Sequence, residues 1–101
     1  MNWWKTDNYP AVIRFVEDSI LVSYPDLEGC ITFGVSEEDA LYNAKEALEG
    51  YIYTLESDHL EIPQPSKIRE IELNKSESIV LVDARMPLVR DQERNRSIKK
   101  H

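Results

Sequence analysis

The 101-residue sequence contains only one cysteine, three glycines and two histidines, and it has no long hydrophobic run. The single cysteine, Cys30, cannot form an intramolecular disulfide, and it lies in an apolar stretch where a thiol usually acts as a small hydrophobic side chain. No run approaches the roughly 20 apolar residues of a membrane-spanning helix, and no apolar signal core follows residues 1–5. We therefore expect a soluble, cytoplasmic protein without a membrane segment.

The same scarcity argues against cofactor chemistry. Two histidines, His59 and His101, lie too far apart to give zinc-ligand spacing with Cys30. Three glycines are too few for a phosphate-binding loop, and no Ser/His/Asp constellation is apparent. The sequence predicts no cofactor, no metal site and no catalytic residues.

The composition predicts one folded domain with an uneven charge distribution. A hydrophobic share of 42% with nine aromatic residues argues against intrinsic disorder. Residues 1–83 hold six basic and seventeen acidic residues, whereas residues 84–101 hold six basic and two acidic residues. The acidic body suits a basic partner, such as a protein that itself binds nucleic acid, while the basic tail favours nucleic acid directly.

Three strands are predicted before a helix. Apolar residues alternate along Tyr9–Val16, and Asp18-Ser19 is a plausible turn into a second strand, Ile20–Tyr24. Turn chemistry at Pro25–Gly29 precedes a third strand, Cys30–Val35.

The helix has a clear start and a continuous apolar stripe. Ser36 followed by Glu37, Glu38 and Asp39 is typical of an N-cap, because the hydroxyl accepts from a free N–H and the acids face the positive end of the helix dipole. The helix should end near Ser57-Asp58. The stripe that should pack on the sheet consists of Ala40, Leu41, Ala44, Ala47, Leu48, Tyr51, Ile52 and Leu55.

After a connector at Pro63–Ser66, one more strand is expected. Ile68–Leu73 alternates only weakly, whereas Ser78–Asp83 is rich in β-branched residues and favours a central or closing strand buried on both faces. From Pro87 onward the chain has no period and predicts a linker or tail.

Four pieces of sequence in this order resemble the HicB antitoxin family. They are Tyr24–Cys30 (Tyr-Pro-Asp-Leu-Glu-Gly-Cys), Thr32–Gly34, Glu38–Ala44 with Glu46–Leu48, and Ile62–Ser66 (Ile-Pro-Gln-Pro-Ser). The resemblance covers roughly residues 9 to 83. It implies an α+β fold, a partial RNase H-like β-β-β-α-β arrangement in which an antiparallel three-stranded sheet and a further strand pack on one long helix.

The resemblance also implies a function. Residues 1–83 would be a toxin-binding domain that inhibits a HicA-type toxin, a small basic ribonuclease that cleaves mRNA through a histidine, by masking its active site. Residues 84–101 would be a basic linker leading to an absent ribbon-helix-helix module, so that operator DNA would be a partner only of a longer chain. A homodimer or higher oligomer is expected, since the strands leave a free sheet edge.

The predicted toxin-binding residues lie opposite the apolar stripe and in the turn before the third strand. Acidic and aromatic groups mixed in this way suit docking against a basic protein, although an ordinary solvated helix face has the same pattern. Glu46 is the first choice for a residue near the toxin's catalytic histidine, and Glu28 is the second. The other candidates on the helix are Tyr42, Asn43, Glu49 and Tyr53, and Glu38 lies on the same face.

Two alternatives come from other functional classes. A DNA-binding regulator would act through the basic C-terminal region. A residual RNase H-like nuclease would need carboxylates that converge on divalent ions, and the candidates are Asp7, Asp18, Asp26 and Asp83, which are otherwise turn and edge residues. Trp3 and Trp4 are interpreted as packing groups that seal one end of the sheet.

Overall fold

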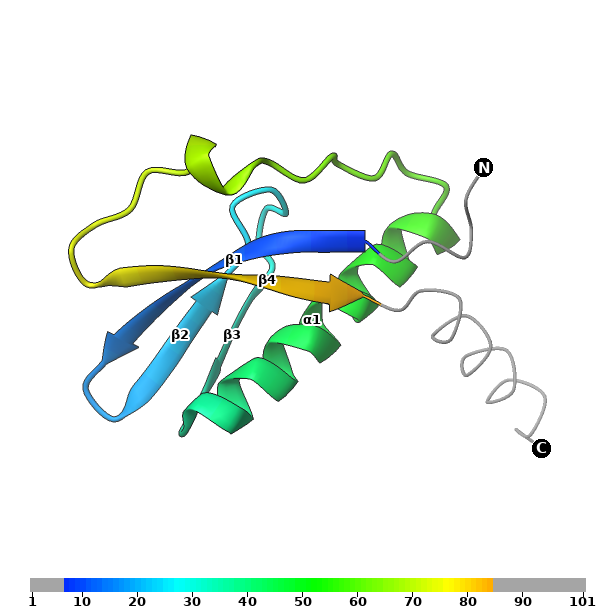
Figure 1. The fold of residues 1–101 in the computed structure, drawn as a ribbon. Helices are drawn as coiled ribbons and strands as arrows, with labels where there is room; N and C mark the ends of the chain where they lie inside the picture. Colours follow the sequence, from blue (N-terminus) through cyan, green and yellow to red (C-terminus); the bar gives the residue numbers. More distant parts are fainter. Residues whose placement is uncertain (1–6, 85–101) are drawn as a thin grey trace, which may run out of the picture.

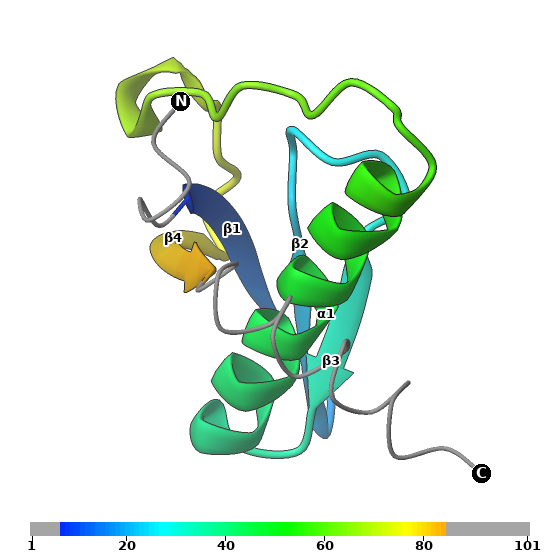
Figure 2. The same ribbon diagram turned by 90° about the vertical axis from the view of Figure 1, so that its right-hand side faces the viewer.

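A computed structural model describes residues 7–84 of the chain. The elements run in the order β1 (Asp7–Val16), β2 (Ser19–Ser23), β3 (Ile31–Gly34), α1 (Glu37–Ser57), the short 3-10 helix η1 (Ile68–Glu70) and β4 (Glu77–Ala84). The strands form one antiparallel sheet of order β3-β2-β1-β4, and α1 packs across one of its faces (Figures 1 and 2). This confirms the predicted α+β class and the β-β-β-α-β order.

The first hairpin forms where it was predicted, with its turn displaced by one residue. Val16 pairs with Ser19, so the turn residues are Glu17 and Asp18 rather than Asp18 and Ser19. Glu17 adopts a φ of 46°, as two-residue hairpin turns require to match the twist of the strands. Side-chain alternation alone could not set this register, because Val12 and Val16 blur it.

Helix α1 begins and ends as predicted. The Ser36 hydroxyl accepts a hydrogen bond from the Asp39 N–H at 3.1 Å, which confirms the N-cap. Asp58 is the C-cap residue, and His59 follows in the left-handed region with a φ of 58°. The Leu60 N–H then donates to the Leu55 carbonyl at 2.8 Å, so the last turn closes in a Schellman-like arrangement.

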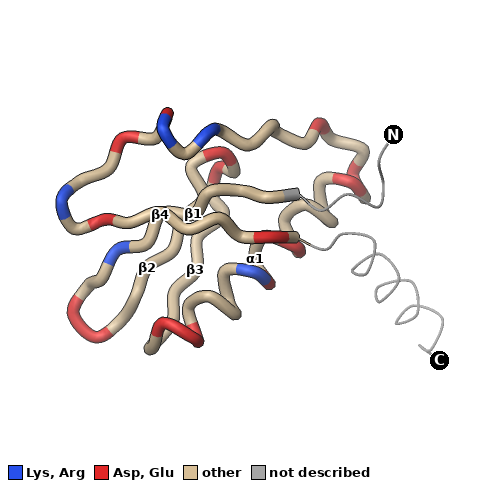
Figure 3. The backbone as a smooth tube through the Cα atoms, viewed as in Figure 1, with Lys and Arg blue, Asp and Glu red and all other residues tan. Residues whose placement is uncertain are grey.

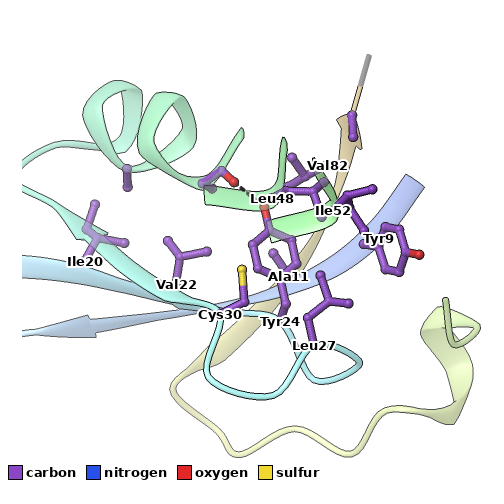
Figure 4. Close-up of a cluster of buried hydrophobic side chains, with 13 residues drawn as sticks. Tyr9, Ala11, Ile20, Val22, Tyr24, Leu27, Cys30, Leu48, Ile52 and Val82 are labelled. Carbon is purple, nitrogen blue, oxygen red and sulfur yellow. Dashed lines mark hydrogen bonds between the residues drawn. The ribbon is translucent and has the colours of Figure 1, made fainter. Parts of the chain in front are cut away.

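The core lies between α1 and the sheet. Every fourth residue of α1 is buried, and these residues face side chains from β1, β2 and β4 (Figure 4). The Tyr24 hydroxyl donates a 2.6 Å hydrogen bond to the Ala44 carbonyl, so its buried polar atom is satisfied by the helix backbone. The buried hydrophobic residues are Tyr9, Ala11, Ile20, Val22, Tyr24, Leu27, Cys30, Ala40, Ala44, Leu48, Ile52, Val82 and Ala84.

Two sequence predictions about burial are wrong. Within residues 7–84, β4 lies at the edge of the sheet beside β1, as expected of a closing strand and not of a central one, and Leu81 is 52% exposed, so this strand is not buried on both faces. Phe15 and Leu41 belong to the predicted core stripes but are 57% and 43% exposed, because they border an open hollow of about 270 Å³ at the N-terminal end of α1. The weakly alternating segment at 68–73, where no strand was predicted, contains η1.

A candidate protein-binding surface

An open groove of about 550 Å³ runs between α1 and the loop that leads into β3. On α1 it is bordered by residues at helical spacing, among which Ala47 and Gly50 have little or no side chain and leave the space open. The residues that line the groove are Gly29, Cys30, Ile31, Glu46, Ala47, Gly50, Tyr51, Thr54 and Leu55.

Glu46 and Tyr42 lie together at the outer rim of this groove. Glu46 lines the groove and is exposed, and Tyr42, one helical turn earlier, is 63% exposed. A hydrogen bond to the Glu46 carboxylate and its negative charge raise the pKa of the Tyr42 hydroxyl. The structure thus brings the first-choice acidic residue and a predicted aromatic residue into one contact.

Glu28 precedes Gly29, which lines the opposite side of the groove. The Tyr51 hydroxyl of α1 donates a 2.8 Å hydrogen bond to the Glu28 backbone carbonyl, and Gly29 follows with a φ of 80°. The loop is closed by the Cys30 N–H, which donates to the Leu27 carbonyl at 3.0 Å. The backbone of Glu28 is therefore held next to the groove that Glu46 lines.

The other three predicted residues are engaged within the domain. The Asn43 side-chain amide donates to the Phe33 carbonyl at 2.9 Å. Glu49 lies 3.2 Å from Lys45 and its side chain is only 18% exposed, while Tyr53 is half-buried and packs against the core. Of the predicted set, Tyr42, Glu46 and Glu28 remain on the open surface.

Several residues that line the groove were not selected from the sequence. Gly50 and Thr54 were not selected, and Tyr51 was assigned only to the apolar stripe. The signal was the pair Ala47 and Gly50, three residues apart on one helix flank, since small residues at this spacing leave room for a partner to approach closely.

Acidic residues far outnumber basic ones along α1 (Figure 3). The helix carries six carboxylates and a single basic residue, Lys45. Lys45 pairs with Glu49 and also donates to the backbone carbonyl of Asp83 in β4, so its charge is directed toward the sheet rather than toward the groove. Although α1 is 21 residues long, no helix within residues 7–84 is long and apolar enough to cross a membrane.

The carboxylates considered for metal-dependent hydrolysis are dispersed. Asp18 lies in the β1–β2 turn, whereas Asp83 pairs with Asn8 at the opposite end of β1 from that turn, and Asp7 begins β1. Asp26 accepts hydrogen bonds from the N–H and hydroxyl of Ser66 at 2.8 and 2.5 Å, which attaches the connector to the β2–β3 loop. Among the described residues, no three His, Cys, Asp or Glu side chains form a possible metal site.

The remaining predicted residues add no ligand set. Cys30 is buried, and burial raises the pKa of its thiol to about 11, so it stays a protonated core residue. His59 is exposed at the C-terminal end of α1. Trp3, Trp4, His101 and the basic tail at 85–101 lie outside the described residues.

Comparison with known proteins identifies the family of this chain. A model described as the HicB-like antitoxin of bacterial toxin-antitoxin systems matches residues 9–97. The chain belongs to the HicB-like antitoxin family. The resemblance predicted from the sequence is therefore confirmed at the level of the family.

Sequence relatives of this HicB-like chain are themselves described only in general terms. It is 37% identical over 62 residues to an uncharacterized 14.9 kDa protein of Haemophilus phage HP1, a match that covers 61% of the chain and 47% of the phage protein. It is 39% identical over 57 residues to a UPF0150 protein of Thermoplasma acidophilum, which covers 55% of the chain and 83% of that protein. The chain thus spans about half the length of the phage relative.

Solved structures show the same fold. A chain in a toxin-antitoxin complex from Streptococcus pneumoniae superposes with a TM-score of 0.74 at 22% identity, covering 84% of this chain and 73% of that one. The N-terminal domain of the Burkholderia pseudomallei antitoxin HicB gives a TM-score of 0.63 at 24% identity, covering 74% and 94%. A chain of a HicA3 and HicB3 toxin-antitoxin complex gives 0.63 at 27% identity, again over 74% and 94%.

Proposed function

We propose that this HicB-like chain is an antitoxin that binds a HicA-type, mRNA-cleaving toxin in the cytoplasm and blocks its active site, without catalysing a reaction itself. The observation that carries the proposal is the exposed Glu46 at an open groove along an acidic helix, with the exposed Glu28 in the loop next to that groove. Membership of an antitoxin family supports the class of partner.

Charge complementarity supports a basic partner. A ribonuclease that binds the RNA backbone must present lysine and arginine side chains, and these face a helix with six carboxylates and one engaged lysine. Opposite fields of this kind raise the rate of association and disfavour partners of the wrong charge. The same acidic surface repels RNA, so the toxin cannot hold the antitoxin and its substrate at the same place.

The groove allows a partner to make close contact with α1, which attraction between opposite charges alone does not provide. Gly50 and Ala47 present almost no side chain, so a backbone segment or aromatic side chain of the toxin can approach α1 closely. Tyr42 adds a large exposed aromatic surface beside Glu46, and aromatic residues of this kind are enriched at the energetically dominant positions of interfaces. Contact area and charge then act on one compact surface.

Masking requires no bond to be made or broken. A toxin histidine placed against the Glu46 carboxylate would be held in its protonated form, because a nearby negative charge favours the charged imidazolium. A protonated histidine cannot accept a proton from the attacking 2′-hydroxyl of RNA. Inhibition would thus combine steric exclusion of RNA with loss of the toxin's general base.

Co-expression tests the proposal. The 101-residue chain is produced with the small basic protein of the neighbouring reading frame, and growth and co-purification are measured. Wild type should restore growth and co-purify, and Glu46→Lys should lose both. Glu61→Lys is the matched control, because Glu61 is an equally charged, exposed residue in the connector after α1. Equal rescue by both variants, or equal loss, would refute a role for Glu46 at the interface.

A further inference from the structure

The loop between β2 and β3, residues 24–30, forms one side of the groove. Gly29 and Cys30 line the groove from this loop, and Ile31 at the start of β3 continues the same side. The other side belongs to the regular helix α1, whereas the loop consists of turns and bends. The width of the groove therefore depends on the contacts that hold this loop in place.

Hydrogen bonds within the loop link its residues into one unit. The Leu27 N–H donates to the Tyr24 carbonyl at 3.1 Å, and the Cys30 N–H donates to the Leu27 carbonyl at 3.0 Å. The Tyr24 N–H donates to the Cys30 carbonyl at 3.2 Å, which closes the loop. Leu27 is fully buried, so the middle of the loop is fixed in the core. A contact at Asp26 therefore also affects the position of Gly29 and Cys30.

Asp26 attaches this loop to the connector that follows α1. Its carboxylate accepts two hydrogen bonds from Ser66, one from the backbone N–H to Oδ2 at 2.8 Å and one from the hydroxyl to Oδ1 at 2.5 Å. Both residues are half-buried, and the loop lies next to the connector in both views of the fold (Figures 1 and 2). Because both carboxylate oxygens are engaged, the side chain cannot rotate freely, and the loop backbone at Asp26 is held in place.

The contact between Asp26 and Ser66 holds the loop from outside the groove. On the α1 side, the Tyr51 hydroxyl donates to the Glu28 carbonyl at 2.8 Å, and Tyr51 itself lines the groove, so a bound partner can disturb this contact. Neither Asp26 nor Ser66 is among the lining residues. Their contact can therefore remain intact when the groove is occupied.

We propose that Asp26 and Ser66 are positioning residues for toxin binding: they hold the loop side of the groove in the conformation that the toxin binds, and they do not touch the toxin themselves. A loop that is fixed before association loses less conformational entropy when the complex forms, so the affinity is higher. This role rests on the proposed antitoxin function. It gives the Asp26 carboxylate a part in binding rather than in metal-dependent hydrolysis.

Substitutions at Asp26 separate an effect of position from an effect of charge. In Asp26→Asn the amide oxygen can still accept from the Ser66 N–H, and the amide nitrogen can donate to the Ser66 hydroxyl oxygen. Both hydrogen bonds then remain while the negative charge is lost. Asp26→Ala loses both hydrogen bonds, and Ser66→Ala loses the one from the hydroxyl. A role in positioning therefore predicts that Asn, but not Ala, replaces Asp26.

Calorimetric titration of the full chain with the purified basic protein of the neighbouring reading frame measures the affinity. The dissociation constant should rise at least about fivefold for Asp26→Ala and by a smaller factor for Ser66→Ala, because they lose two hydrogen bonds and one. Asp26→Asn should bind as wild type does. Glu61→Gln is the matched control, since it removes the charge of an exposed carboxylate in the connector, and it should also bind as wild type does.

Amide hydrogen exchange in the chain without toxin distinguishes positioning of the loop from a general loss of stability. The Cys30 N–H reports on the loop and the Leu48 N–H on α1. Asp26→Ala should accelerate exchange at Cys30 at least about fivefold more than at Leu48, and Asp26→Asn should not. Equal acceleration at both amides, or equal loss of affinity in Asp26→Ala and Asp26→Asn, overturns the positioning role. If wild type does not bind the toxin, the antitoxin proposal fails and this role with it; if wild type and Asp26→Ala bind equally well, only the positioning role fails.

Discussion

The side-chain amide of Asn43 in α1 donates a 2.9 Å hydrogen bond to the backbone carbonyl of Phe33 in β3. One turn earlier, the Asp39 carboxylate accepts from the Val35 N–H. Two side chains at i and i+4 on the helix therefore bind one polar backbone group of the edge strand β3 and one of the residue that follows its end. The contact explains why Asn43, which the sequence placed on the binding surface, acts mainly within the domain.

Replacing Asn43 should weaken the domain measurably. Asn43→Ala should lower the free energy of unfolding by about 1 kcal/mol, since it leaves the Phe33 carbonyl without its side-chain donor. Thr54→Ala is the control, because Thr54 is exposed on the same helix and gains similarly in helix propensity. Urea unfolding compares the two, and an Asn43→Ala variant as stable as Thr54→Ala would contradict the assignment.

Two glycines should respond in opposite directions to the same substitution. A Cβ on Gly34 would lie 2.4 Å from the Ala40 backbone nitrogen, whereas a Cβ on Gly50 meets nothing within 4 Å. Gly34→Ala should therefore destabilise by about 2 kcal/mol or more, because β3 and the start of α1 must move apart. Gly50→Ala should stabilise by about 0.5 to 1 kcal/mol through helix propensity. Thermal unfolding distinguishes the signs; the same sign for both would be inconsistent with the close approach at Gly34.

Most elements of the fold could be predicted from local sequence signals. Ser36 with three following acids located the helix start correctly, because the cap is formed by neighbouring residues alone. The position of β4 in the sheet could not be predicted from local signals, because an apolar strand at an edge and one in the centre have the same composition. Its edge position follows from its pairing with β1. The exposure of Phe15 and Leu41 likewise depends on where α1 crosses the sheet, which no local pattern contains.

The end of α1 offers a stabilising substitution. His59 has a φ of 58° at the position where glycine is preferred, since a Cβ is strained in the left-handed region. His59→Gly should raise the free energy of unfolding by roughly 1 kcal/mol. The control is Asp58→Gly, at a residue with a φ of −90°, which gains nothing from glycine. Chemical denaturation measures both, and destabilisation by His59→Gly would count against this helix ending.

Stability should fall at alkaline pH. Burial raises the pKa of the Cys30 thiol from 9.0 to about 11, and burial also raises the pKa of Tyr24. The unfolded chain therefore releases these protons at lower pH than the folded chain, so the contribution of these two groups to stability is constant below about pH 9 and declines as the pH rises toward 11. Cys30→Ala should flatten the first part of this decline in urea unfolding. An unchanged pH dependence would mean that the thiol is not the responsible group.

The binding surface was only partly accessible from the sequence. Glu46, Tyr42 and Tyr53 all lie opposite the buried stripe by helical spacing alone, but the structure keeps only Glu46 and Tyr42 of these exposed, while Tyr53 is half-buried. Glu49 and Asn43 lie toward the flanks of the helix, where their partners come from distant strands or from the next helical turn. Glu28 lies next to the groove because the Tyr51 hydroxyl donates a hydrogen bond to its backbone carbonyl. The two residues are 23 positions apart in the sequence, so this contact exists only in the folded chain.

The most direct measurement is titration of the purified toxin with this chain while RNA cleavage is followed. We predict that cleavage stops at a fixed molar ratio, that Glu46→Lys shifts inhibition to at least about tenfold higher concentration, and that Glu61→Lys behaves as wild type. Added salt should weaken binding, because the contact is between opposite charges at a surface. Undiminished cleavage in the presence of excess chain would contradict the antitoxin assignment, and inhibition insensitive to Glu46→Lys would move the interface away from α1.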